Sequence, residues 1–134
     1  MTSLKDIKII DIPVIEDFRG NLAVIEGETV PFDFKRVYYL YDVPCTSKRG
    51  GHSHKTQSEV LIATSGSFEV ILDDGKNRQT FFLNKPNKGL VLVPGIWREI
   101  SNFSSGSVCM VLSSSVFNEN DYIRDYNNFL ASKQ

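Results

Sequence analysis

The sequence predicts an all-β fold, a sandwich or a barrel built from about nine short strands. Three observations support this prediction. Short runs rich in β-branched and aromatic residues recur at regular spacing along the chain. Turn-forming Gly, Pro, Asn, Asp and Ser residues separate these runs. Apolar residues at helical spacing are confined to the end of the sequence.

The first third of the chain contains three strand patterns and a turn. Isoleucines and valines fill Lys5–Val14, so we expect a strand there that Pro13 interrupts. The segment Asp17–Asn21 predicts a turn with Gly20 at its tight point. Aromatic and β-branched residues indicate a further strand over Arg36–Val43.

The strands after residue 57 follow from apolar runs and the turns between them. Ser58–Thr64 is short and largely apolar, which predicts a buried strand. The run Asp73-Asp74-Gly75 is a hairpin signal between two flanking strands. The expected strands are Lys5–Val14, Leu22–Glu26, Arg36–Val43, Ser58–Thr64, Phe68–Leu72, Asn77–Leu83, Leu90–Val93, Trp97–Asn102 and Ser107–Ser114.

The tail Asn118–Ala131 has apolar residues at near-helical spacing, and Asn118 or Asn120 is suited to cap a helix. We therefore expect a short C-terminal helix packed on the barrel, with an aromatic stripe that serves as core. The residues of this stripe are Tyr122, Ile123, Tyr126, Phe129 and Leu130.

Length and charge exclude several classes of protein. A chain of 134 residues favours one domain spanning 1–134, and its net charge of −1 lacks the basic field that nucleic-acid binding needs. The longest apolar runs, such as Gly89–Pro94, are too short to span a bilayer, and the N-terminus does not resemble a signal peptide. Cys45 and Cys109 are too few for a disulfide framework, so we expect a cytoplasmic protein with reduced cysteines.

The stretch Arg49–Gly66 contains both histidines of the chain and marks a candidate site. In an extended strand His52 and His54 would point to the same face, and imidazoles exchange protons near neutral pH and bind metals. The alternative is a solvated strand end where two polar residues share a face. The spacing His52-x-His54-x4-Glu59-x6-Gly66 resembles the first motif of the cupin superfamily, which implies a jelly-roll β-barrel.

A second, looser cupin motif is carried by Gly89, Pro94-Gly95 and Asn102, with Arg98 where cupins usually have a histidine. In metal-binding cupins that histidine joins the first-motif ligands around one divalent ion. A guanidinium only donates hydrogen bonds and stays protonated, so it would repel a cation. We therefore expect a site without metal. A metal held by the two histidines and the first-motif glutamate, with the arginine turned away, remains the alternative.

Motifs along nearly the full chain resemble the nucleotide-sugar 3,4-ketoisomerases, a family of small cupins. They are DxRGxL at 17–22, YYLYDVP at 38–44, RGGHSHK at 49–55, SGSFEVILDDG at 65–75, VPGIWREI at 93–100 and DYIRDYNNFL at 121–130.

This resemblance implies an isomerase that moves the ketone of dTDP-4-keto-6-deoxyglucose from C4 to C3, in the synthesis of a dTDP-linked 3-amino-3,6-dideoxy sugar. It also implies a reaction without metal or other cofactor, and a homodimer in which strands are exchanged. Relatives commonly have Gln at the position of Glu59. Three roles are open for this glutamate: a third metal ligand, an ion-pair partner of Arg98, or a group that orients a histidine. The Arg98 position varies between His and Arg among relatives, and we expect it to influence the C4 configuration of the product.

The reaction needs a base that takes a proton from C3 and delivers one to C4. The family motif favours His52 as this base, although the residues alone do not rank it above His54, which would orient it or shuttle protons on oxygen. We expect Tyr38 to donate to the developing enolate oxygen and Arg98 to stabilise its negative charge. Plain packing for Tyr38 and a surface position for Arg98 are the alternatives.

The diphosphate of a nucleotide sugar needs cations or backbone donors. Basic residues near the site-bearing loops are the candidates, and Glu59 completes the expected substrate-binding set. These basic residues are Arg19, Lys48, Arg49 and Lys55. Three other functions stay open at this point: a nucleotide-sugar epimerase, a metal-binding cupin that serves as an oxygenase or small-molecule sensor, and a non-catalytic interaction domain.

Overall fold

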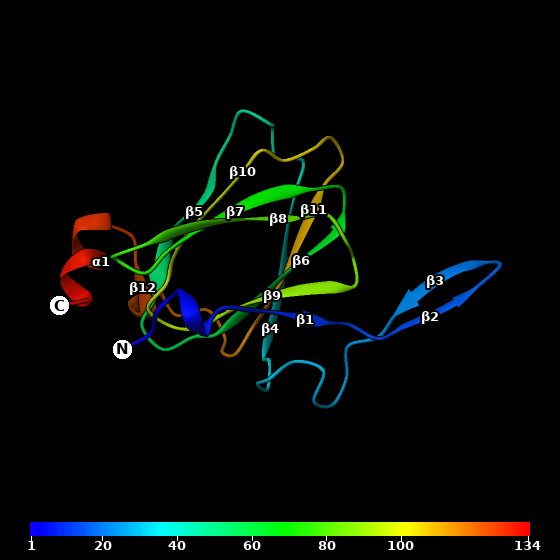
Figure 1. The fold of residues 1–134 in the computed structure, drawn as a ribbon, viewed down its shortest axis with the longest axis horizontal. Helices are drawn as coiled ribbons and strands as arrows, with labels where there is room; N and C mark the ends of the chain where they lie inside the picture. The colour runs from blue at the N-terminus through cyan, green and yellow to red at the C-terminus, as the bar shows by residue number, and fades with distance from the viewer.

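The computed structural model describes residues 1–134 and contains two five-stranded antiparallel sheets that face each other across a hydrophobic core (Figure 1). The first sheet has the strand order β1-β9-β6-β11-β4, and the second has the order β12-β5-β10-β7-β8. Strands β2 and β3 form a separate hairpin. The predicted all-β, jelly-roll architecture with a short C-terminal helix is confirmed.

The strands of the first sheet are β1 (Lys8–Asp11), β4 (Arg36–Tyr41), β6 (Glu59–Ser65), β9 (Lys88–Leu92) and β11 (Val108–Ser113). Those of the second sheet are β5 (Arg49–His54), β7 (Phe68–Asp73), β8 (Arg78–Leu83), β10 (Trp97–Ser101) and β12 (Tyr122–Ile123).

Three strands were not anticipated as separate elements. The first predicted run divides at Pro13, after a 3₁₀ turn η1 (Leu4–Asp6), into β1 and β2. Strands β5 and β12 carry weak sequence signals, and they form because each pairs with a neighbour that is distant in the sequence. Both of these strands hold residues of the candidate site described below.

Strand β4 shows how side-chain alternation separates the core from the surface. Val37, Tyr39 and Tyr41 are exposed, whereas Tyr38 and Leu40 are partly buried and pack against the core. The largest fully buried side chains of this core are Phe68, Phe103, Leu61, Leu72, Leu90, Leu92 and Ile96.

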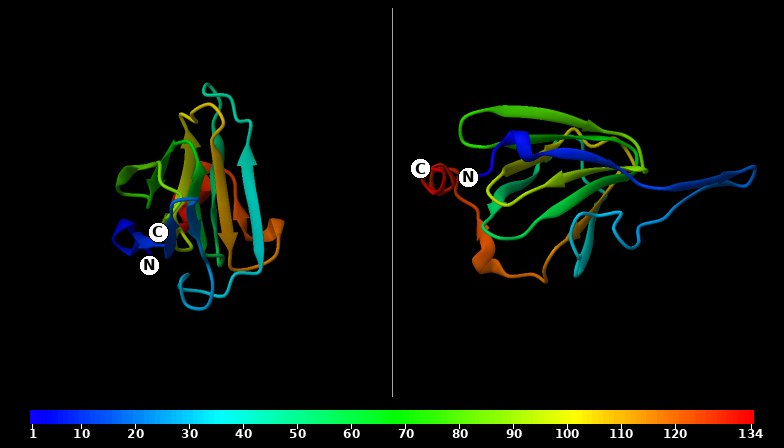
Figure 2. Two further views of the ribbon diagram at one scale, coloured as in Figure 1. Left: turned by 90° about the vertical axis from the view of Figure 1, so that its right-hand side faces the viewer. Right: turned by 60° about the horizontal axis from the view of Figure 1, so that its bottom comes forward.

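The hairpin of β2 (Val14–Asp17) and β3 (Gly20–Ala23) extends away from the barrel (Figure 1), as the views of Figure 2 also show. Its apolar side chains Ile15, Phe18 and Leu22 are exposed, with Phe18 at 98%. Apolar residues of a projecting hairpin have no partner within the chain, which is a feature of surfaces that bind another protein.

The C-terminal segment differs from the prediction. The helix expected over Asn118–Ala131 is divided into a 3₁₀ helix η2 (Glu119–Asp121), strand β12 and a helix α1 (Tyr126–Ser132). The longer helix was wrong because β12 hydrogen-bonds to β5, and this tertiary pairing outweighs helical periodicity. Helix α1 begins after Asp125, whose side chain accepts a hydrogen bond from the backbone N–H of Asn128. No helix in the structure has both the length and the apolar content that a bilayer crossing requires.

We predict that Gly66→Ala destabilises the barrel more than Gly106→Ala. Both glycines have positive φ, +67° and +73°, so each substitution should cost about 1 kcal/mol from backbone strain. A Cβ at Gly66 would also lie 2.5 Å from Ser104 Oγ and 2.7 Å from Ser107 Cβ, whereas one at Gly106 meets no atom within 4 Å. We expect a further loss of about 1–3 kcal/mol for Gly66→Ala. Urea unfolding measures both values, and equal losses would contradict the prediction.

Candidate active site

Strand β5 carries both histidines and lies between β10 and β12 in the second sheet. His52 is opposite Arg98 of β10, and His54 is opposite Tyr122 of β12. Gly50 permits the close pairing with β10, since its φ is +88° and a Cβ there would lie 3.0 Å from the Arg98 carbonyl oxygen. Strand pairing therefore brings a guanidinium and a phenol ring beside the histidine pair.

The two imidazoles meet edge to face, with ring centroids 4.9 Å apart and an angle of 85° between the planes. The ring of Tyr122 packs against both, 4.8 Å from His52 and 4.4 Å from His54. His54 is completely buried, whereas His52 is 8% exposed and lines a cavity. His52 is therefore the histidine that a small molecule in this cavity would meet.

Glu59, at the start of β6, links the two sheets through polar contacts. Its Oε2 accepts a hydrogen bond from the Tyr38 hydroxyl at 2.9 Å, and its Oε1 accepts one from Arg98 Nη1. His54 Nε2 lies 3.5 Å from Oε1, and Arg36 Nη2 lies 3.7 Å from Oε2. The carboxylate is fully buried, so these donors and charges replace the water that would otherwise solvate it.

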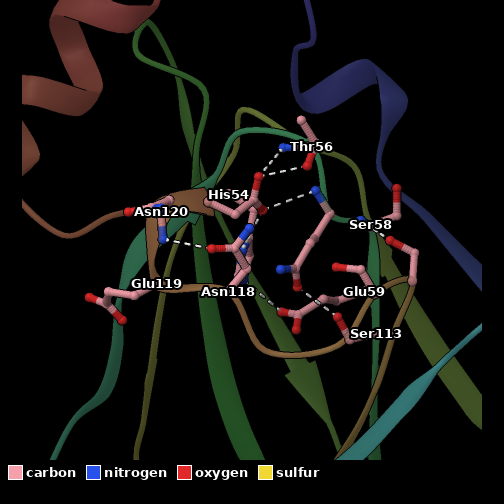
Figure 3. A network of polar contacts seen from close by, with 12 residues as sticks. His54, Thr56, Ser58, Glu59, Ser113, Asn118, Glu119 and Asn120 are labelled. Atoms are coloured by element: carbon pink, nitrogen blue, oxygen red, sulfur yellow. Dashed lines mark hydrogen bonds and ion pairs between the residues drawn. The ribbon is translucent and has the colours of Figure 1, made fainter.

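A second carboxylate lies on the other side of His54. Oδ2 of Asp121, the last residue of η2, is 3.2 Å from His54 Nδ1. Figure 3 shows the polar network in which His54, Thr56 and Glu59 take part. The imidazole of His54 is thus held between two carboxyl groups, one from each side of the ring.

The environment keeps His52 neutral and Glu59 charged. Burial, together with the charge of Arg98, lowers the pKa of His52 from 6.5 to about 3. Burial by itself raises the pKa of Glu59, but Arg98 and His54 outweigh it and lower the pKa to about 2. Burial and the Glu59 charge raise the pKa of Tyr38, so its hydroxyl stays protonated. Neither ring nitrogen of His52 has a hydrogen-bond partner in the protein.

The residues present do not fit a divalent metal ion. Ligand atoms of His52, His54 and Glu59 lie within 4.8 Å of one another, as a metal site would require. However, the Glu59 oxygen that faces the histidines already accepts a hydrogen bond from the buried guanidinium of Arg98, and the other oxygen is held by Tyr38. A cation bound there would displace Arg98 and lie beside its positive charge.

The cavity in front of His52 has a volume of about 240 Å³ and combines an apolar floor with a basic rim. The apolar residues are Leu40, Leu61, Ile100 and Val111. The polar residues are Arg36, Tyr38, Arg49, His52, Arg98, Tyr122 and Arg124. Such a site suits an anionic molecule that also presents a less polar part.

The structure brings most, but not all, of the predicted site residues together. His52, Tyr38, Arg98 and Arg49 line the cavity, with His54 and Glu59 directly behind them. The remaining basic candidates do not line this cavity. Lys55 borders a different hollow beside Gly95, Lys48 pairs with Glu99 at 3.8 Å, and Arg19 pairs with Asp17 at 2.8 Å near the hairpin tip.

Comparison with known proteins agrees with this geometry. A family model described as "FdtA: WxcM-like, C-terminal" matches residues 5–134. The chain is also 46% identical to the TDP-4-oxo-6-deoxy-alpha-D-glucose-3,4-oxoisomerase of Aneurinibacillus thermoaerophilus. The alignment spans 123 residues and covers 91% of this chain and 88% of the relative. The chain belongs to the family that this model describes, together with the oxoisomerase.

Solved structures of the family superpose closely on the chain. A 3,4-ketoisomerase from Helicobacter canadensis matches with a TM-score of 0.93 and 44% identity, over 96% of this chain and 97% of that one. A histidine-to-asparagine mutant of the 3,4-ketoisomerase QdtA from Thermoanaerobacterium thermosaccharolyticum, in complex with TDP-4-keto-6-deoxyglucose, matches with a TM-score of 0.95 and 38% identity, over 98% and 96%. The protein is therefore a 3,4-ketoisomerase, and hence an isomerase.

Sequence patterns missed several residues of this ketoisomerase site. Tyr122 was assigned to a helical core stripe, and Asp121 and Arg124 beside it were assigned no role, because no local pattern indicated that β12 pairs with β5. Arg36 was taken only as the start of a strand. The motif DYIRDYNNFL, shared with the ketoisomerases, was the one signal that could have drawn attention to Asp121, Tyr122 and Arg124.

We predict that His52→Asn weakens the dependence of stability on pH in the acidic range. Unfolded His52 binds a proton near pH 6.5, whereas the folded protein binds it only near pH 3. Between these values the unfolded state holds the extra proton, so the free energy of unfolding rises with pH. Removing the imidazole should reduce this slope by up to about 1.4 kcal/mol per pH unit. Urea unfolding at several pH values measures the slopes, and equal slopes in both proteins would show that His52 is not held neutral.

Proposed function

We propose that this ketoisomerase acts on a dTDP-linked 4-keto-6-deoxyhexose and moves its ketone from C4 to C3 by histidine-mediated proton transfer. The observation that carries the proposal is the neutral imidazole of His52, which lines the cavity with both ring nitrogens unpaired. The relatives support the substrate class, since QdtA has been solved with TDP and with TDP-4-keto-6-deoxyglucose.

In the proposed reaction His52 is the base that takes the proton from C3. The electrons of that C–H bond form a C3–C4 double bond, and the C4 carbonyl oxygen becomes an enediolate oxygen. Delivery of a proton to C4, with transfer of the O3 proton to O4, gives the 3-keto product. A single neutral imidazole can serve both carbon centres, because they are adjacent. His54 is buried behind His52, so we assign it an orienting role.

Arg98 is suited to stabilise the enediolate. Arg98 is 2% exposed, and its Nε and Nη2 atoms have no hydrogen-bond partner, although Nη1 is held by Glu59. Unpaired donors on a buried cation beside the base stabilise negative charge that develops on a substrate oxygen. Tyr38 lines the same cavity and stays protonated, but its single O–H hydrogen is donated to Glu59 Oε2, so it would have to leave that acceptor before donating to the enediolate. No metal or other cofactor enters this scheme.

The basic rim is suited to bind the diphosphate of the nucleotide. Arg36, Arg49 and Arg124 reach the cavity from three different strands or strand ends, on β4, β5 and just after β12. Guanidinium groups bind phosphate oxygens through paired, charge-assisted hydrogen bonds. Arg124 also lies over the Tyr122 ring at 4.2 Å, which fixes this cation close to the histidines.

We propose further that two chains form a homodimer in which the hairpin β2–β3 packs on the partner. The hairpin exposes Ile15, Phe18 and Leu22 to solvent in the single chain, and a second copy would cover them. Such an exchange would bring Arg19, which does not line the cavity of its own chain, toward the site of the partner.

The product chemistry indicates the place of the enzyme in a biosynthetic sequence. A ketone at C3 is the group that an amine donor would attack, so we propose a role in the synthesis of a dTDP-linked 3-amino-3,6-dideoxy sugar. We also propose that residues 1–134 act as one domain in the cytoplasm. The two free cysteines, Cys45 and Cys109, support this location, because a reducing compartment keeps thiols unpaired.

The decisive experiment is an NMR time course with dTDP-4-keto-6-deoxyglucose in deuterated water that contains EDTA. We expect a 3-keto product that carries deuterium at C4, and the same spectrum gives its C4 configuration. His52→Asn should lower kcat about 1000-fold, because the proton-transfer group is lost. Turnover that requires an added metal would contradict the role of Arg98. A product that is epimerised while its ketone stays at C4 would show that the enzyme is an epimerase.

We predict that Arg124→Gln and Arg19→Gln each raise KM about tenfold and leave kcat within about twofold. Each change removes one charge-assisted contact to the diphosphate, and such contacts contribute about 1.5–3 kcal/mol. Lys85→Gln is the matched control, since this exposed lysine does not line the cavity. Steady-state kinetics measure these effects. An unchanged KM for Arg19→Gln would show that the exchanged hairpin does not bind the diphosphate. An unchanged KM for Arg124→Gln would show that the cavity rim near β12 does not bind it.

A further inference from the structure

Asp121 is a buried carboxylate whose hydrogen-bonding capacity is used on both oxygens. Its side chain is 6% exposed. Oδ1 accepts hydrogen bonds from the Thr56 backbone N–H at 2.8 Å and from the Thr56 hydroxyl at 2.6 Å. Oδ2 accepts from the Gln57 backbone N–H at 3.2 Å and lies 3.2 Å from His54 Nδ1. The carboxylate thus holds the turn after β5 and one edge of the His54 ring.

These contacts determine which nitrogen of His54 carries a proton. Burial raises the pKa of Asp121, but the hydrogen bonds from Thr56 and Gln57 outweigh it and the pKa is lowered. An ionised carboxylate has no proton to donate and can only accept. His54 Nδ1 must therefore be the donor in this contact. Nε2 lies farther from its carboxylate, 3.5 Å from Glu59 Oε1, and makes no hydrogen bond, so the contact with Asp121 is the one that holds the proton.

The His54 ring has no freedom to adopt another arrangement. It is completely buried, and the rings of His52 and Tyr122 pack against it with centroids 4.9 Å and 4.4 Å away. Rotating the ring by 180° would turn a carbon toward Asp121 and leave the carboxylate without its imidazole donor. Because His54 in turn packs against His52, its orientation affects where the proposed base stands.

We propose that Asp121 is a positioning residue of this ketoisomerase, which fixes the tautomer and orientation of His54 and through it the placement of His52 toward the substrate. The proposal rests on the proposed role of His52 as the base. Asp121 does not line the cavity itself, so it acts through His54 and not by contact with the sugar.

Asp121→Asn separates this role from a merely structural one. An asparagine of nearly the same shape can keep its oxygen on Thr56, which places its NH₂ group opposite His54 Nδ1 and costs the hydrogen bond from the Gln57 backbone N–H. An amide NH₂ donates, so Nδ1 would have to accept, and the His54 proton would move to Nε2, toward Glu59. The substitution is expected to reverse the tautomer while the fold is retained.

The first test is a two-bond ¹H–¹⁵N NMR spectrum of the uniformly ¹⁵N-labelled resting protein near neutral pH. The chain has only two histidines, and His52→Asn assigns their signals. We expect the wild-type His54 to carry a proton on Nδ1, and Asp121→Asn to lose that proton from Nδ1 and carry one on Nε2. A His54 pattern that is unchanged in Asp121→Asn would overturn the proposal.

The second test is kinetic. We expect Asp121→Asn to lower kcat about 100-fold with KM within about threefold, because positioning affects the proton-transfer step more than substrate binding. In a His54→Gln background, Asp121→Asn should lower kcat by less than about threefold further, since the residue through which it acts is gone. A full additional 100-fold loss in that background would overturn the proposal.

Thr56→Val is the structural control. It removes the hydroxyl contact to Asp121 Oδ1 and leaves the contact between Asp121 and His54 in place. We expect it to lower Tm as Asp121→Asn does, with kcat within about twofold of the wild type and the same His54 tautomer. A kcat loss as large as that of Asp121→Asn would mean that loosening the turn explains the effect.

If the wild type showed no isomerase turnover, the proposed function would fail, while the tautomer spectrum would still decide whether Asp121 sets the state of His54.

Discussion

The buried carboxylate of Glu59 is the interaction on which the rest of the site depends. It accepts hydrogen bonds from Tyr38 of its own sheet and from Arg98 of the facing sheet, so it joins the two halves of the barrel at the cavity. A buried ion pair of this kind adds little net stability, because desolvation offsets the Coulomb attraction. Its importance lies in specificity: losing one partner leaves the other as an uncompensated charge, which costs about 3–5 kcal/mol.

The same pairing supports the proposal that this cupin barrel acts on a ketone with its own side chains. Arg98 brings a permanent positive charge to the place where other cupins bind a cation. Glu59 pairs with Nη1 of this guanidinium only. The donors on Nε and Nη2 of that guanidinium have no hydrogen-bond partner within the chain, which supports their proposed contact with a substrate oxygen. The positive charge also disfavours protonation of the adjacent His52, which keeps the imidazole in its basic form.

The C-terminal segment adds three side chains to the site. Asp121 and Tyr122 are adjacent in the sequence. Asp121 contacts one edge of the His54 ring, and the Tyr122 ring packs against both imidazoles. Arg124, two residues further on, adds a cation to the cavity rim. The pairing of β12 with β5 therefore places the proposed base, the group that orients His54 and a basic side chain together, although it involves only two residues of the segment.

Local patterns in the sequence determined the strands, the turns and the histidine motif, because alternation and turn chemistry depend on neighbours along the chain. His52, His54, Glu59 and Arg98 were placed in one site on motif spacing, and the structure brings these four side chains together. Only the tertiary structure decided that Tyr122 and Asp121 leave a helical pattern to pair with β5, and that His54 lies behind His52. The physical reason is that hydrogen bonds between distant strands, and the burial of one ring by another, depend on which surfaces meet in space, and a periodic pattern in one segment carries no information about that partner.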